Sequence, residues 1–144
     1  MFGQSATTEP RNISKALVDL NSLPKEWHLL QTHGNRAVII LPCDSPNEQI
    51  DIQFHEEKAV LTLLKYGKEL KYQVLSCRLR PEFIGDNRIY DLTLVDQLGT
   101  QKHVIIKNIA GQSIWYGLGN PEETRIYTSE ENVSLYDKVE ATCD

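Results

Sequence analysis

From Gln49 to Val139 the chain is a series of short runs of β-forming residues, separated at nearly regular intervals by turn sequences. Gln49–His55 shows the pattern most clearly, because apolar and polar residues alternate along it as in a strand with one buried face. Turns are indicated by stretches such as Gly67-Lys68-Glu69 and Gly85-Asp86-Asn87, whose residues adopt turn conformations readily. This rhythm favours an antiparallel sandwich or barrel.

The expected strands follow one another at the spacing of about 8–12 residues that is typical of sandwiches and barrels. They cover 27–32, 36–41, 49–55, 59–66, 70–80, 88–96, 102–109, 113–118 and 124–128, with a weaker strand or a short helix at 133–139. Within 70–80 the apolar residues change from one face of the strand to the other, which predicts a β-bulge. We therefore expect an all-β fold, a single antiparallel up-and-down β-barrel or sandwich of about 8–10 strands.

One short helix is expected near the N-terminus, where Ile13, Ala16, Leu17 and Leu20 fall on a single helical face. Residues 1–11 are polar and show no periodicity, so we expect a disordered segment there and a single domain over 12–144. A chain of 144 residues is long enough to bury a core of its own. The alternation predicts that this core contains Ile52, Phe54, Leu61, Leu63, Leu92, Leu94, Ile106 and Ile114.

The formal net charge of −5 argues against nucleic acid as a partner, because phosphate binding depends on clustered Lys and Arg. Residues 122–144 carry the whole of this net charge. This region is either a solvated end of the chain or an acidic face for a basic protein partner. No apolar run approaches the ~20 residues that a membrane helix needs, so no integral membrane segment is expected.

The sequence contains no hydrolase elbow, P-loop or dinucleotide fingerprint, and its four histidines do not have the spacing of a metal site. We therefore predict a non-enzymatic protein without a cofactor. The three cysteines, Cys43, Cys77 and Cys143, allow either one disulfide with one thiol left over or three thiols. Cys77 faces the same way as Leu75 and Leu79 on its strand, which predicts a buried side chain.

A short N-terminal helical segment, Trp27 near the start of the first strand and an up-and-down series of strands together resemble the lipocalin-like, or calycin, barrels. The resemblance runs from about Ile13 to Cys143, although Glu26 stands where that family has a Gly and its Thr-Asp-Tyr motif is absent. It implies a barrel that carries a small apolar or amphipathic ligand. It also implies Arg125 over Trp27 and, in an exported protein, a disulfide between Cys77 and Cys143 with Cys43 free.

In such a barrel we expect Phe54, Tyr72, Tyr90 and Tyr116 to line the ligand site, because aromatic side chains suit a pocket wall. Arg78 would meet an anionic head group, provided that the bulge lies beyond it. The alternative function is a protein–protein interaction domain, such as an inhibitor or an immunity-type partner, that uses an exposed sheet face or the acidic C-terminal region. Phe2–Ser5 look like the remainder of a secretory cleavage region, which favours a secreted or periplasmic location over a cytoplasmic one.

Overall fold

A computed structural model of the chain describes residues 23–55, 58–80, 88–109, 112–119 and 122–143. The helix expected from Ile13 to Leu20 and the segment 1–11 lie outside these residues. The described elements are β1 (Glu26–His33), β2 (Arg36–Leu41), β3 (Gln49–His55), β4 (Lys58–Lys65), β5 (Lys68–Leu79), β6 (Arg88–Val95), β7 (Gln101–Ile109), β8 (Gln112–Tyr116), β9 (Thr124–Ser129), the 3₁₀ helix η1 (Glu130–Leu135) and β10 (Lys138–Glu140). Strands β1 to β9 thus begin and end within two residues of the positions that the alternation predicts, whereas the predicted segment 133–139 contains the end of η1 and the start of β10.

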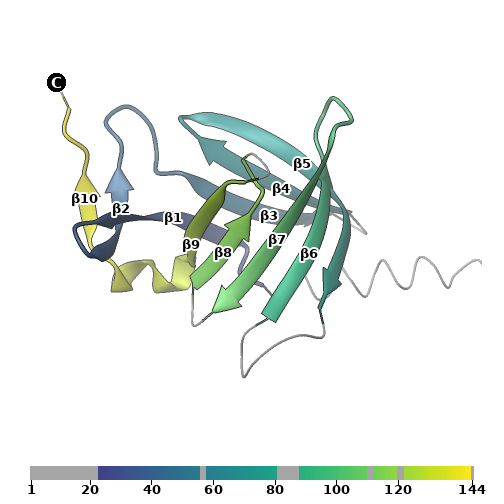
Figure 1. The fold of residues 1–144 in the computed structure, drawn as a ribbon. Coiled ribbons are helices and arrows are strands. Elements are labelled where there is room, and N and C mark those ends of the chain that lie inside the picture. Colours follow the sequence, from purple (N-terminus) through teal and green to yellow (C-terminus); the bar gives the residue numbers. More distant parts are fainter. Residues whose placement is uncertain (1–22, 56–57, 81–87, 110–111, 120–121, 144) are drawn as a thin grey trace, which may run out of the picture.

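Strands β3 to β9 form an up-and-down meander in which each strand pairs antiparallel with the next (Figure 1). β1 closes this meander, because it pairs with β3 through Glu26–His28 and with β9 through Trp27–Leu30. The result is a closed antiparallel barrel of eight strands, β1 and β3–β9. The predicted fold class is confirmed, and of its two architectures the chain adopts the barrel.

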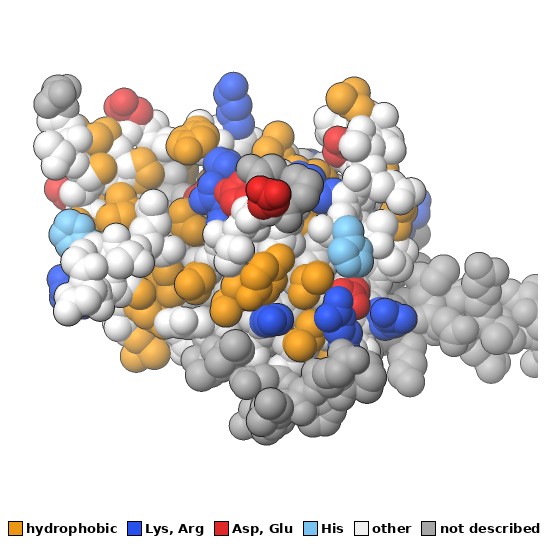
Figure 2. Space-filling model, in the orientation of Figure 1, with side chains coloured by type: hydrophobic (Ala, Val, Ile, Leu, Met, Phe, Trp, Pro, Cys, Tyr) orange, Lys and Arg blue, Asp and Glu red, His pale blue; other side chains and the backbone are white. Residues whose placement is uncertain are grey.

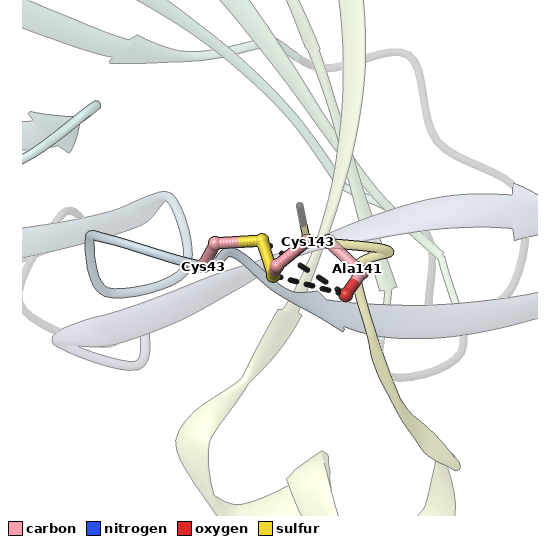
Figure 3. Close-up of a disulfide and its surroundings, with 3 residues drawn as sticks. All are labelled: Cys43, Ala141 and Cys143. Carbon is pink, nitrogen blue, oxygen red and sulfur yellow. Dashed lines mark hydrogen bonds between the residues drawn. A yellow bond between two sulfur atoms is a disulfide. The ribbon is translucent and has the colours of Figure 1, made fainter.

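β2 and β10 lie side by side at one flank of the barrel (Figure 1). The last residues of β1, Gln31–His33, turn away from the barrel and pair with β2, and β10 then pairs with β2 in parallel. A disulfide between Cys43 and Cys143 joins the chain just beyond these two strands, with the Cα atoms 5.9 Å apart (Figure 3). The C-terminal strand is therefore held to the rest of the protein both by a backbone ladder and by a covalent link.

This disulfide shows that the expected pairing of Cys143 with Cys77 is wrong. Cys77 lies on β5 with its side chain only 3% exposed in the barrel core, which confirms its predicted burial. The C-terminal residues instead follow β2, where the backbone N–H of Ala141 donates to the Leu41 carbonyl at 2.9 Å. Because parallel pairing with β2 carries residue 143 to the end of that strand, Cys43 is the cysteine within reach.

The core fills the barrel, and it contains most of the residues that the alternation predicts for it. Ile52, Leu61, Leu63, Leu92, Leu94 and Ile106 are each at most 3% exposed, and Phe54 is partly buried against them. Ile114 is the exception, because β8 points Ser113 and Trp115 inward and Ile114 outward. The predicted bulge is present in β5, where the register with β6 shifts between Val74 and Ser76.

Candidate ligand-binding site

The centre of the barrel is packed with large aromatic side chains. Trp27, Tyr90, Trp115 and Tyr127 are each at most 1% exposed. The Trp115 ring meets both Trp27 and Tyr127 edge to face, with ring centroids 6.3 and 5.7 Å apart, a preferred geometry for aromatic pairs. These contacts fill the middle of the barrel, which leaves its two ends and its outer face as places where a ligand could bind.

The five residues expected to line a ligand site do not come together. Tyr72 and Tyr90 face inward as expected, but both belong to the packed core. Phe54, near the end of β3, is only partly buried. Tyr116 faces outward, because inward-facing Trp115 precedes it, and the ammonium of Lys107 lies 5.3 Å from its ring centroid.

Arg78 also faces outward, and its side chain is 81% exposed. The bulge of β5 lies before Arg78 instead of beyond it, so the parity that would have turned this side chain inward is reversed. Its guanidinium lies 3.6 Å from a carboxylate oxygen of Asp91, on the outer surface. The expected anchor for an anionic head group is therefore not inside the barrel.

One end of the barrel, named here the Glu48 end, contains Glu48, Lys102, Leu118 and Arg125. The Tyr127 hydroxyl donates a 2.5 Å hydrogen bond to Glu48, whose other carboxylate oxygen lies 3.3 Å from the Arg125 guanidinium. Arg125 also pairs with Glu123, so its guanidinium is bound by two carboxylates there and is not placed over Trp27 as the resemblance implied.

These contacts shift two pKa values at the Glu48 end. Burial, reinforced by the hydrogen bond to Glu48, raises the pKa of Tyr127 well above its ordinary value. Burial of Arg125 by itself would lower the pKa of the guanidinium, but the carboxylates of Glu48 and Glu123 more than offset it, and that pKa is raised. At neutral pH the network therefore holds a neutral phenol and a charged guanidinium.

Lys102 and the segment after β8 cover the same end. The Lys102 ammonium donates to the carbonyls of Leu118 and Gly119 at 2.6 and 3.0 Å and lies 5.2 Å from the Tyr72 ring centroid. Gly117, with φ of +86°, lets the chain turn over the barrel, since a Cβ there would lie 2.8 Å from the His103 carbonyl oxygen. Leu118 is 2% exposed beneath this turn. The Glu48 end is thus closed by the protein's own side chains.

The opposite end, named here the pocket end, opens to solvent through a pocket of about 1010 Å³. It lies where the start of β1, the end of β3, the end of β7 and the start of η1 meet, and it is lined by Leu23, Pro24, Lys25, Glu26, Trp27, Asp51, Ile52, Gln53, Phe54, Asn108, Ser129, Glu130, Glu131 and Asn132. Its volume is in the range of pockets that hold small molecules.

The pocket combines an apolar wall, a small polar group and a charged rim. Leu23, Trp27, Ile52 and Phe54 form the apolar wall, which is continuous with the barrel core. Asn108 accepts a 3.3 Å hydrogen bond from the hydroxyl of Ser113, beside it on β8. This arrangement, an apolar surface with a few polar groups, is that of a site for a small ligand with an apolar body.

Four of the lining residues are acidic, namely Glu26, Asp51, Glu130 and Glu131, and one, Lys25, is basic. Glu26 and Asp51 are direct partners across the β1–β3 pair. Glu130 is in hydrogen-bond contact with the ring of His28, and the ammonium of Lys25 lies 5.8 Å from the centroid of the Phe54 ring. The rim is therefore predominantly negative.

The outer face of β7, β8 and β9 carries a second feature. Ile105 pairs with Tyr116, and Ile114 pairs with Ile126, so that four apolar side chains adjoin on neighbouring strands. We name these residues the outer patch. Figure 2 shows hydrophobic side chains gathered on this face, with basic and His side chains close by. Ile126 is 39% exposed, and the other three are half-buried.

Asp91, on β6, lies next to the outer patch, because it pairs with Ile105 on β7. It accepts two hydrogen bonds from the Arg80 guanidinium, at 2.7 and 2.8 Å, and it is 8% exposed. These bonds lower the pKa of its carboxyl, although burial opposes the shift, and nearby His103 and Arg78 lower it further. Asp91 is thus held ionised among basic side chains.

Sequence reasoning found Phe54 but missed the rest of the pocket. Glu26 and Asp51 read as solvent-side residues of their strands, and Glu130 as part of an acidic C-terminal region. No local feature of the sequence marks these residues as lining a pocket, because the strand ends that meet there depend on β1 pairing with both β3 and β9.

Within the part of the chain that the structure describes, no helix has the length and apolar character needed to cross a membrane. Nor do the His, Cys, Asp and Glu side chains of those residues form a group of three or more that is arranged to hold a metal ion. Comparisons of the chain with protein-family models, with curated proteins and with solved structures find no significant match.

Proposed function

We propose that this protein is a non-enzymatic binding module that carries a small apolar or amphipathic ligand, in the manner of the lipocalin-like barrels. The observation that carries the proposal is the pocket of about 1010 Å³ at the pocket end, whose apolar wall is continuous with the core. The other end is covered by Lys102 and Leu118, so among the described residues the pocket end is the entrance that a ligand would use. Burial of its apolar body supplies the affinity, at about 25 cal/mol per Å².

The ligand site proposed from the structure differs from the one expected from the sequence. Phe54 remains a ligand-contacting residue and is joined by Leu23, Trp27 and Ile52. Tyr72 and Tyr90 belong to the packed core and are not among the lining residues, and Tyr72 lies against Lys102 at the Glu48 end. Arg78 and Tyr116 lie on the outer face and have no part in it.

Titration with a neutral, polarity-sensitive dye tests this function. We expect saturable binding to the wild type with enhanced and blue-shifted emission, and binding at least about tenfold weaker to Phe54→Ala, because the wall loses its most accessible ring. Tyr116→Ala is the matched control, since it removes a half-buried aromatic ring from the outer face. Absence of saturable binding, or equal weakening by the two substitutions, would count against a ligand carrier.

The location that we propose is secreted or periplasmic. The disulfide between Cys43 and Cys143 supports it, because such bonds persist in oxidising compartments and are rare in the cytosol. Cell fractionation of the producing organism, with alkylation of thiols before lysis, distinguishes the two locations. Recovery of the protein from the cytosolic fraction with all three cysteines alkylated would overturn the proposal.

A second candidate function, protein–protein interaction, is supported by the outer patch. Its four apolar side chains adjoin across three strands and are flanked by Lys107 and by the group around Asp91. We infer that a partner would present apolar residues beside acidic ones. Peptides selected from a random display library for binding to the protein should then combine apolar and acidic residues. These peptides should no longer bind the variant Ile114→Asp, in which an outward-facing residue of the patch is changed. Peptides that bind this variant as well as the wild type would exclude the patch as the interface.

A further inference from the structure

We propose that the ligand of the pocket carries a cationic head group, such as an alkylammonium, on its apolar body. The inference rests on the proposed carrier function and specifies the chemistry of the ligand. It reverses the expectation from the sequence, in which Arg78 would have met an anionic head group. Arg78 is on the outer surface, and the charged groups with which the described residues line the pocket are four carboxylates and one ammonium.

The strongest indication is the pairing of Glu26 with Asp51. The two residues are direct cross-strand partners on the outward face of β1 and β3, where that face borders the pocket, and like charges in that position destabilise a sheet. Neither carboxylate forms an ion pair with any residue that the structure describes, and Asp51 accepts only an uncharged hydrogen bond, from the Gln53 amide at 2.9 Å. A cationic head group at the rim would relieve this repulsion on binding.

Lys25 shows how a cation is held beside the apolar wall. Its ammonium lies 5.8 Å from the centroid of the Phe54 ring, which is within the range of a cation–π contact. The side chain of Lys25 is exposed, so it is free to move aside. An alkylammonium ligand would take the same position over Phe54 while its chain lies along Trp27 and Ile52.

Ser129 and Asn108 add uncharged polar groups to the lining of the pocket. Ser129 is 2% exposed and lies across from Trp27 in the β1–β9 pair, and Asn108 comes from the end of β7. Both are uncharged, so these two lining residues offer no positive partner to a carboxylate or sulfate. An anionic amphiphile would place its head group where one ammonium, that of Lys25, faces four carboxylates, so net repulsion in a partly desolvated site disfavours it.

The test compares three probes that share one decyl chain and differ in charge: decyltrimethylammonium, a neutral decyl glycoside and decyl sulfate. Each is used below its micelle concentration to displace the neutral dye from the intact protein. We expect the cationic probe to bind about tenfold more tightly than the neutral one, and the anionic probe to bind more weakly than both. The preference should shrink as salt is raised from 0.01 to 0.5 M, because exposed charges are screened.

Variants locate the effect. The double substitution Glu26→Gln with Asp51→Asn should abolish the cationic preference without weakening the neutral glycoside, while Lys25→Ala should strengthen binding of the cationic probe by removing its competitor. Glu69→Gln, which removes an exposed carboxylate from the start of β5 at the other end of the barrel, is the control and should leave all three affinities unchanged.

The outcomes separate the two proposals. Equal displacement by all three probes, with the dye still bound in the pocket, would refute the cationic preference and leave the carrier function standing. A preference that Glu69→Gln removes as effectively as the rim variant would also refute it, because the effect would then arise from overall charge. Failure of the dye and of every probe to bind would overturn the carrier function itself.

Discussion

The hydroxyl of Tyr127 donates a 2.5 Å hydrogen bond to Glu48, a carboxylate that is brought into the closed end of the barrel by the segment before β3. Both side chains are buried, and Arg125 binds the other oxygen of the same carboxylate. The contact joins residues 79 positions apart in the sequence. It ties the last strand of the barrel to the connection between β2 and β3, on the far side of β1.

Removing this hydroxyl should destabilise the fold. Tyr127→Phe leaves one lone pair of the buried Glu48 carboxylate without its donor, so we expect a loss of about 1–3 kcal/mol in the free energy of unfolding at pH 7. Denaturant titration measures the change. Tyr116→Phe is the matched control, because its ring lies on the outer face, and it should change stability by less than about 0.5 kcal/mol.

The same contact predicts a loss of stability at alkaline pH. Burial raises the pKa of Tyr127 above its ordinary value of 10.0, so the folded protein holds the phenol proton more tightly than the unfolded chain does. This contribution is complete below pH 10 and declines as the pH rises above it. Unfolding measured from pH 8 to 12 should therefore show a steeper decline for the wild type than for Tyr127→Phe; parallel curves would contradict it.

Asp91 predicts the corresponding acid limb. The hydrogen bonds from Arg80 hold its pKa below the ordinary 3.8, so its stabilising contribution is present above that pH and is lost as the pH falls through the lower folded value. Asp91→Asn should cost about 1–3 kcal/mol at pH 7 and lessen the loss of stability below pH 4. The control is Asp44→Asn, at an exposed position, which should alter neither quantity.

The disulfide predicts a thiol count and a local opening. Oxidised protein in denaturant should show one reactive thiol, that of Cys77, and reduction should raise the count to the full three.

The double substitution Cys43→Ser with Cys143→Ser should lower the free energy of unfolding by about 2–5 kcal/mol. Hydrogen exchange should speed up first at the Ala141 amide, which bonds to β2, and not at Leu92 in the barrel. Three reactive thiols in oxidised protein would rule the disulfide out.

The barrel core predicts a large contrast between two substitutions of similar size. Leu92→Ala, at a side chain with no exposure, should cost about 2–5 kcal/mol, because it leaves a cavity among closely packed residues. Ile114→Ala, on the outward face of β8, should cost less than half as much, since its side chain is partly solvated before the change. Equal losses would mean that Ile114 points into the barrel, so that the two faces of β8 are exchanged.

Much of the strand pattern could be read from the sequence, because alternation is a local property. Ile50, Ile52 and Phe54 share a face in any extended conformation, and β3 begins and ends where that pattern does. The bulge in β5 was visible for the same reason, as a change of phase between Val74 and Cys77. Which residues of β8 face inward could not be predicted, because Ser113-Ile114-Trp115-Tyr116 offers an apolar residue to each face of the strand. Only the size of the space inside the barrel decides that the Trp115 side chain enters it.

The candidate site shows the same division. Phe54 was expected at a ligand site from its own strand, but the association of Glu26 with Asp51 requires the pairing of β1 with β3, and Glu130 arrives only because β9 returns to β1. The orientation of Arg78 depended on which side of it the bulge lies, a matter of one residue in the ladder with β6. A difference of one residue reverses the face of every side chain that follows.

The sequence by itself determined the all-β class, the approximate number of strands and several of the core residues, because each follows from the period of apolar residues along short runs. Tertiary structure alone decided that the sheet closes through β1 and β9, that Cys143 meets Cys43 instead of Cys77, and that carboxylates gather at the pocket. These are contacts between residues far apart in the chain. Nothing in the local pattern specifies them, since they arise only when closing the barrel buries the apolar faces of all eight strands together.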